Sequence, residues 1–230
     1  MIKNPKALMT LIRNKLMSNL SFEEKLKWFH EKGITVVEED GSYFLKSDPR
    51  GHISELTDVC NGIIFHPPYL VSFPGWQTQD ISLTELKQDK DFIFDETTIF
   101  IEPLDDGQTI YMFWDPAIDK WRFSSPKKIK SPYEDIVSKI IKNVMSGEYC
   151  YTYTLKLIES GENKGLYLES LFDHERFKEE SLERVVQFAQ KFDIKYPKLY
   201  RLEKNNMIEE SDLPVIVRDI SGHKYKITKI

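Results

Sequence analysis

The chain has 230 residues, of which 40% are hydrophobic, 13% aromatic and 30% charged, and its formal net charge is −5 at pH 7. This composition is typical of a folded domain rather than a disordered chain, and the length suits one large domain. Proteins that coat nucleic acid non-specifically are usually basic, so the negative charge argues against that class. Contact with nucleic acid would have to come from local basic clusters, namely Lys127, Lys128 and Lys130, or Lys224, Lys226 and Lys229.

The sequence contains no sign of membrane insertion or secretion. No apolar run approaches the roughly 18 residues of a membrane span, and the first twenty residues are amphipathic rather than a signal peptide. Cys60 and Cys150 are too few and too far apart for a disulfide framework or a metal site. We therefore expect a cytoplasmic protein with reduced thiols and no membrane partner.

Residues 1–33 are predicted to form two helices. Apolar residues of the first recur at helical spacing, at Leu8, Leu11, Ile12 and Leu16. Ser21 and Glu24 form a capping box at the start of the second helix, and Gly33 is placed to end it. The two helices predict an N-terminal helical segment.

From Ile34 onward the pattern changes to short strands. Asp40-Gly41 supplies the tight turn of a first hairpin. About ten strands are expected in all, over 34–47 (two strands), 62–66, 69–73, 97–103, 108–114, 120–125, 148–160, 165–172, 214–219 and 224–230. Helices are expected from a capping box at Ser131 and Glu134, and over about 175–192. The pattern predicts an antiparallel-rich α+β fold, with residues 34–230 as a single compact unit.

The most informative stretch is an acidic glycine turn between two strands, Leu104-Asp105-Asp106-Gly107. Around it, further segments occur in a fixed order: Asn61–Phe65, Val71–Trp76, Tyr153–Ile158, Leu213–Asp219 and Lys224–Lys226. Together these segments resemble the motifs of the adenylation domain of ATP-dependent RNA ligases. The resemblance covers roughly residues 34–229. It implies the ATP-grasp-like nucleotidyltransferase fold of RNA and DNA ligases, with ATP and Mg²⁺ as the implied cofactors.

The departures from the family pattern concern the residues that do its chemistry. The lysine that forms the covalent adenylate in the family corresponds to Leu104, and a leucine has no nucleophilic atom. The nucleotide-binding arginine corresponds to Asn61, and the ribose-binding glutamate to Lys156, a reversal of charge. The glutamate and glycine of the late strand correspond to Leu213 and Pro214. No catalytic residue is therefore expected.

The resemblance leaves a set of residues that would bind nucleotide or RNA: Asp106, Gly107, Lys156, Arg218, Lys224, Lys226, Phe73 and Trp76. The late lysines suit phosphate because each carries a compact charge. Phe73 and Trp76 would contact a base. No metal site is expected, because the five histidines lack metal-ligand spacing and Asp105-Asp106 reads as turn chemistry.

Three hypotheses remain open. The first is a pseudo-enzyme that retains the ligase-like fold to bind a nucleotide, an RNA end or a protein partner. The second is a divergent but active RNA ligase or adenylyltransferase in which Lys120 or Lys127 replaces the missing nucleophile. The third is a protein-interaction or inhibitor module with no nucleotide ligand.

Overall fold

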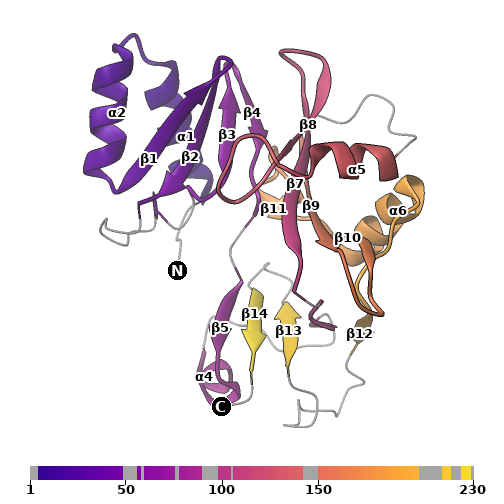
Figure 1. The fold of residues 1–230 in the computed structure, drawn as a ribbon. Coiled ribbons are helices and arrows are strands. Elements are labelled where there is room, and N and C mark those ends of the chain that lie inside the picture. Colours follow the sequence, from indigo (N-terminus) through magenta and orange to yellow (C-terminus); the bar gives the residue numbers. More distant parts are fainter. Residues whose placement is uncertain are drawn as a thin grey trace. The chain divides into compact units, whose positions relative to one another are not determined.

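The computed structural model describes residues 5–48, 56–57, 60–75, 78–89, 98–104, 106–141, 150–201, 214–218 and 224–228. It is a mixed α+β structure in which almost every strand pair is antiparallel, which confirms the predicted fold class. The chain divides into two compact units (Figure 1). Unit 1 comprises Met1–Gly75 and Gln108–Lys195, and unit 2 comprises Trp76–Gly107 and Tyr196–Ile230.

Unit 1 begins with the two expected helices, α1 (Pro5–Met17) and α2 (Phe22–Glu31). The capping box is present: Ser21 Oγ accepts the Glu24 N–H, and Glu24 Oε2 accepts the Ser21 N–H at 2.8 Å. Gly33 has a φ of 72°, a conformation that favours glycine, and it ends α2 before the first strand. Helix α2 packs directly on that strand.

The first sheet of unit 1 has four antiparallel strands in chain order. These are β1 (Ile34–Glu39), β2 (Ser42–Ser47), β3 (Ile63–His66) and β4 (Tyr69–Ser72). Asp40 and Gly41, with φ angles of 51° and 75°, form the predicted turn between β1 and β2.

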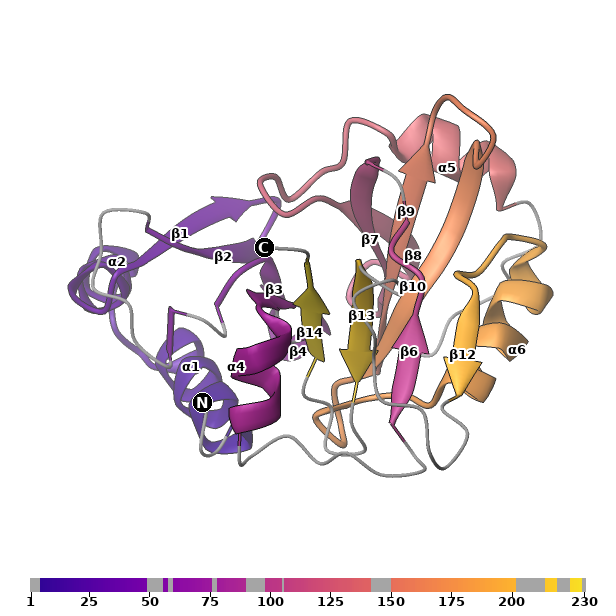
Figure 2. The same ribbon diagram turned by 90° about the horizontal axis from the view of Figure 1, so that it is seen from below.

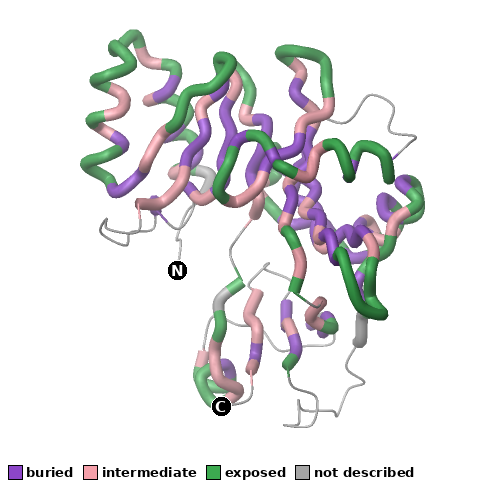
Figure 3. The backbone as a smooth tube through the Cα atoms, viewed as in Figure 1, coloured by how far each residue is buried: buried purple, intermediate pink, exposed green. Residues whose placement is uncertain are grey.

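The second sheet of unit 1 has the order β11-β10-β9-β7-β8. Its strands are β7 (Gln108–Asp115), β8 (Lys120–Ser124), β9 (Tyr151–Ile158), β10 (Gly165–Asp173) and β11 (Lys178–Glu179). Helices α5 (Glu134–Ile140) and α6 (Leu182–Phe192) contribute Val137, Val185, Phe188 and Phe192 to the large apolar core on one face of this sheet. Figure 3 shows many buried residues along the inner strands of this sheet, β7, β9 and β10.

The opposite face of the second sheet packs against the first sheet, and a buried ion cluster joins the two. Asp115 of β7 has no exposed surface, and its Oδ2 lies 2.8 Å from His66 Nδ1 of β3 and 3.0 Å from Arg122 Nη1 of β8. Arg122 also donates to Ser42 Oγ of β2 at 2.7 Å. One buried carboxylate therefore holds strands from both sheets.

Unit 2 contains a five-stranded sheet with the order β12-β6-β13-β14-β5, and Figure 2 shows β12, β6, β13 and β14 side by side. Its strands are β5 (Gln79–Ile81), β6 (Ile99–Ile101), β12 (Leu199–Arg201), β13 (Val215–Arg218) and β14 (Lys224–Ile227). The short helix α4 (Leu83–Gln88) begins with a capping box between Ser82 and Glu85. Only the β14–β5 pair is parallel among the described strand pairs.

Two helix predictions in unit 1 were wrong at their starts. Helix α6 begins at Leu182 rather than near 175, because Asp173 accepts the N–H groups of Glu175 and Arg176 and makes a turn before β11. Helix α5 begins at Glu134 without a side-chain cap, since Ser131 Oγ accepts the N–H of Tyr133 instead. In both places a local side-chain to backbone bond competes with the helix.

Candidate functional site

Basic residues gather on one face of the unit 2 sheet. Arg218 pairs with Lys224 across β13 and β14, and Lys226 lies two residues beyond Lys224. Directly paired residues and residues two apart in a strand point to the same face, so all three cations share it. We call Arg218, Lys224 and Lys226 the basic face. By the same register, Asp80 of β5 lies beside Lys226.

The other face of this sheet is apolar and covered by α4. Leu86 of α4 forms a buried cluster with Phe100, Val215, Val217 and Ile227. Tyr225, which lies between the two lysines in sequence, points to this covered face and donates from its hydroxyl to Asp89 Oδ2 at 2.6 Å. The strict alternation of β14 therefore fixes Lys224 and Lys226 on the side away from α4.

Arg218 is buried, and Lys224 and Lys226 are half-buried. Within the described part of the chain, the side chain of Lys226 makes no hydrogen bond or ion pair. A lysine that is partly buried without a partner gains from an anionic group beside it, because burial removes part of its hydration. The basic face is thus suited chemically to phosphate.

The acidic glycine turn follows β6 in the same unit. Leu104 is half-buried, Asp106 is exposed and Gly107 is half-buried. Nearby, Glu102 donates its N–H to the Lys198 carbonyl, which fixes the strand end just before Leu104. The side chain at 104 is aliphatic, so this position can supply packing but neither a nucleophile nor a charge.

Lys156 lies in unit 1, on the face of β9 opposite the helices. Its cross-strand neighbours are Thr109 of β7 and Tyr167 of β10. It is half-buried, and its side chain makes no hydrogen bond or ion pair among the described residues. Tyr111 lies two residues beyond Thr109 in β7. Burial and the negative charge of Glu169 raise the pKa of Tyr111 to about 12, so its phenol stays protonated at neutral pH.

Phe73 is fully buried and packs edge-on against Phe172, with ring centroids 4.5 Å apart. Its N–H donates to Thr152 Oγ1 at 2.8 Å. The next residues press closely on the second sheet: a Cβ at Gly75 would lie 3.2 Å from the Phe172 ring. A role for Phe73 in ligand binding stays a prediction, and its burial makes that role one of positioning the segment rather than stacking on a base.

The two lysines proposed as substitute nucleophiles lie at different places in unit 1. Lys120 pairs with Asp115 at the far end of β7 from Gln108, the residue after the acidic glycine turn. Seven residues of strand separate these ends, a distance of about 24 Å. Lys127 is exposed in a turn after β8, whose last residue Ser124 pairs with Tyr111. Lys127 is therefore the nearer of the two along the sheet.

Some predicted residues lie outside the described part of the chain: Trp76, Asp105, Leu213 and Lys229. Among the residues that are described, no group of three or more His, Cys, Asp or Glu side chains is arranged to hold a metal ion. None of the described helices is long and apolar enough to cross a membrane. Both cysteines are free, and burial raises the pKa of the Cys60 thiol.

Sequence reasoning missed a buried polar connection between the two sheets of unit 1. His174 Nε2 lies 2.6 Å from Thr152 Oγ1, and its Nδ1 lies 3.2 Å from the Leu70 carbonyl. Thr152 thereby links His174 to the Phe73 N–H. A histidine just after the run Gly165–Phe172 was the available signal, but nothing in the local sequence indicates its distant partners.

No protein-family profile and no curated protein matches this sequence. Solved structures do match the fold. An archaeal ATP-dependent RNA ligase matches in two structures, form 2 and form 1, with TM-scores of 0.65 and 0.62 and sequence identities of 11% and 12%. A putative ATP-dependent DNA ligase from Aquifex aeolicus matches with a TM-score of 0.64 and 13% identity.

The two RNA ligase matches each cover 96% of this chain and 64% of the ligase chain. The DNA ligase match covers 90% of this chain and 62% of the ligase chain. This chain therefore spans less than two thirds of the length of the ligases that it matches. At these identities the likeness concerns the fold alone. The fold is similar to that of ATP-dependent RNA and DNA ligases, which confirms the fold that the resemblance implied.

Proposed function

We propose that this protein binds a nucleotide or a phosphorylated RNA end through the basic face of unit 2 and does not become adenylylated. The observation that carries the proposal is the register of β13 and β14, which puts Arg218, Lys224 and Lys226 on one side of the sheet. Three cations so arranged suit a group with several phosphate oxygens, since arginine binds in a fork and lysine as a point charge.

The expected lack of AMP transfer to the protein follows from the residue at position 104. A covalent adenylate needs a side-chain amine that attacks the α-phosphate, and Leu104 has none. Loss of a nucleophile costs many orders of magnitude in rate, but it does not remove the cations of the basic face that would contact phosphate. Binding without transfer is the function that this combination supports.

The proposal is tested by melting curves with ATP, AMP and short RNAs carrying a 5′- or a 3′-phosphate. A ligand at 100 times its dissociation constant adds about 2.7 kcal/mol, which for a chain of this size is a shift of roughly 5 to 10 °C. The variant Lys226→Gln removes one cation of the basic face. Lys87→Gln is its matched control, because Lys87 is an exposed lysine of α4 on the covered side of the same sheet.

We expect a shift with at least one phosphorylated ligand, a smaller shift in Lys226→Gln and an unchanged shift in Lys87→Gln. Lys156→Gln belongs in the same series, since Lys156 is expected to contact the same ligand and its side chain makes no hydrogen bond or ion pair among the described residues. Absence of any shift would contradict the proposal and favour a protein-interaction module. Covalent labelling by ATP would favour a divergent ligase, and Lys127→Arg would then be the first variant to examine.

A further inference from the structure

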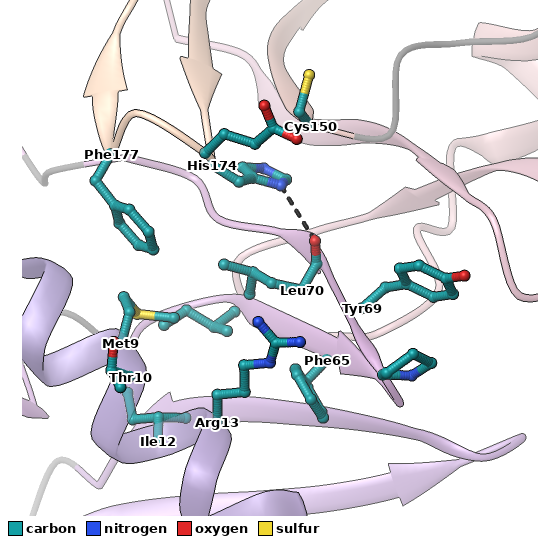
Figure 4. Close-up of a pocket in the computed structure, with 13 residues that line it drawn as sticks. Met9, Thr10, Ile12, Arg13, Phe65, Tyr69, Leu70, Cys150, His174 and Phe177 are labelled. Atoms are coloured by element: carbon teal, nitrogen blue, oxygen red, sulfur yellow. Dashed lines mark hydrogen bonds between the residues drawn. The ribbon is translucent and has the colours of Figure 1, made fainter.

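Unit 1 contains a cavity that the proposed function does not use. Its volume is about 500 Å³, within the range of small-molecule sites. Helix α1, the β3–β4 hairpin and the turn between β10 and β11 form its walls (Figure 4). All of these elements belong to unit 1.

The walls of this cavity are mainly apolar. Met9 and Ile12 contribute from α1, Phe65 and Leu70 from the hairpin, and Phe177 from the turn. Met9, Ile12 and Phe65 are almost fully buried, so they form a fixed floor rather than mobile surface side chains. An occupant must therefore present an apolar body to them.

The lining contains one permanent cation, Arg13, and one carboxylate, Glu175. His174 is neutral at pH 7, because burial lowers its pKa to about 4, and both of its ring nitrogens are already hydrogen-bonded. Arg13 lines the cavity from α1, and its guanidinium points toward the hairpin in Figure 4. Among the described residues the Arg13 side chain makes no hydrogen bond or ion pair, whereas Glu175 has interactions within the protein, one of them from its N–H to Asp173 Oδ1.

We propose that this cavity binds an apolar organic molecule that carries one carboxylate, with Arg13 pairing with the carboxylate and the aliphatic and aromatic walls enclosing the rest. The planar fork of a guanidinium matches the two oxygens of a carboxylate. The apolar floor admits a hydrocarbon chain or ring but leaves a second charge without a partner. The ligand is therefore distinct in class from a nucleotide.

The test is calorimetric titration of the intact chain with octanoate, octanol and octylamine, which share the chain and differ in charge. We expect saturable 1:1 binding of octanoate, weaker binding of octanol and none of octylamine. Arg13→Gln should weaken octanoate binding roughly tenfold or more, the usual effect of losing a charged hydrogen-bonded pair. Arg13 is exposed, so this variant should fold normally.

Two further variants locate the site. Thr10→Trp places a large ring at an exposed lining position of α1 and should abolish octanoate binding while circular dichroism stays unchanged. Lys27→Gln removes an exposed cation of α2 that does not line the cavity and should leave octanoate binding unchanged. The proposal is overturned if native protein shows no saturable binding, if Arg13→Gln binds octanoate like the native protein, or if octylamine binds as well as octanoate.

Discussion

His174 Nε2 and Thr152 Oγ1 lie 2.6 Å apart inside unit 1, and together they connect the second sheet to both ends of the β4 segment. The Leu70 carbonyl can only accept, so the Nδ1 of His174 carries the proton and Nε2 accepts the Thr152 O–H. Thr152 Oγ1 in turn accepts the Phe73 N–H. This arrangement requires a neutral imidazole.

Stability should therefore fall in mild acid. Burial lowers the pKa of His174 from its ordinary 6.5 to about 4, so between these values the unfolded chain binds a proton that the folded chain does not. The free energy of unfolding should be highest above pH 6.5 and should decrease as the pH falls toward 4, by roughly 3 kcal/mol in total from this group. Urea unfolding at pH 7, 6, 5 and 4 measures the decrease.

The control for this prediction is His174→Gln, which cannot titrate. It should be less stable than the native protein at pH 7, and its own loss of stability between pH 6.5 and 4 should be clearly smaller. An identical pH dependence in the two proteins would show that other groups cause the acid sensitivity.

Loss of the Asp115 carboxylate should strongly destabilise unit 1. The carboxylate has no exposed surface and faces both His66 and Arg122. Asp115→Ala leaves that arginine without its counter-charge, and such a break typically costs 3–5 kcal/mol, so we expect a loss of about that size in urea unfolding. Lys130→Ala, which removes an exposed pair with Glu134 at 3.9 Å, should cost less than about 1 kcal/mol. Similar losses in the two variants would contradict the role of the buried cluster.

Alanine substitutions at Gly62 and Gly161 distinguish the stability cost of backbone strain from the cost of crowded packing. Both glycines have left-handed backbone angles, with φ of 87° and 84°. A Cβ at Gly62 would lie 3.0 Å from Pro74 Cγ and 3.2 Å from Tyr111 Cε2, whereas a Cβ at Gly161 meets nothing within 4 Å. Gly62→Ala should therefore lower the free energy of unfolding by about 1–3 kcal/mol more than Gly161→Ala. Equal losses would mean that the β3–β4 segment does not press on Tyr111.

Local sequence patterns predicted the elements whose causes are themselves local. The Ser21–Glu24 capping box and the Asp40-Gly41 turn occur as expected, because each depends on residues within one turn of chain. The same kind of signal was present and overlooked at Ser82 and Glu85, which begin α4. A capping box can be recognised before a short helix as well as before a long one.

The candidate site could be predicted only in part. Alternation in residues 224–227 already indicates that Lys224 and Lys226 share a face, but which strands lie beside them depends on pairings between distant segments. Arg13 gave no signal, and nothing local indicated the partners of His174, because the cavity arises from segments that are far apart in sequence. The aromatic Phe73 was assigned to ligand contact, yet its burial depends on Phe172, almost a hundred residues later.

The most direct test of the central claim is the retention of α-labelled ATP by the protein, measured on one sample in the presence of Mg²⁺, first under native conditions and then after denaturation. We expect label that is retained on the native protein, is reduced in Lys226→Gln and is released completely on denaturation, because Leu104 cannot form a covalent adenylate. Label that survives denaturation, or native protein that retains neither ATP nor a phosphorylated RNA in the same assay, would contradict the central claim.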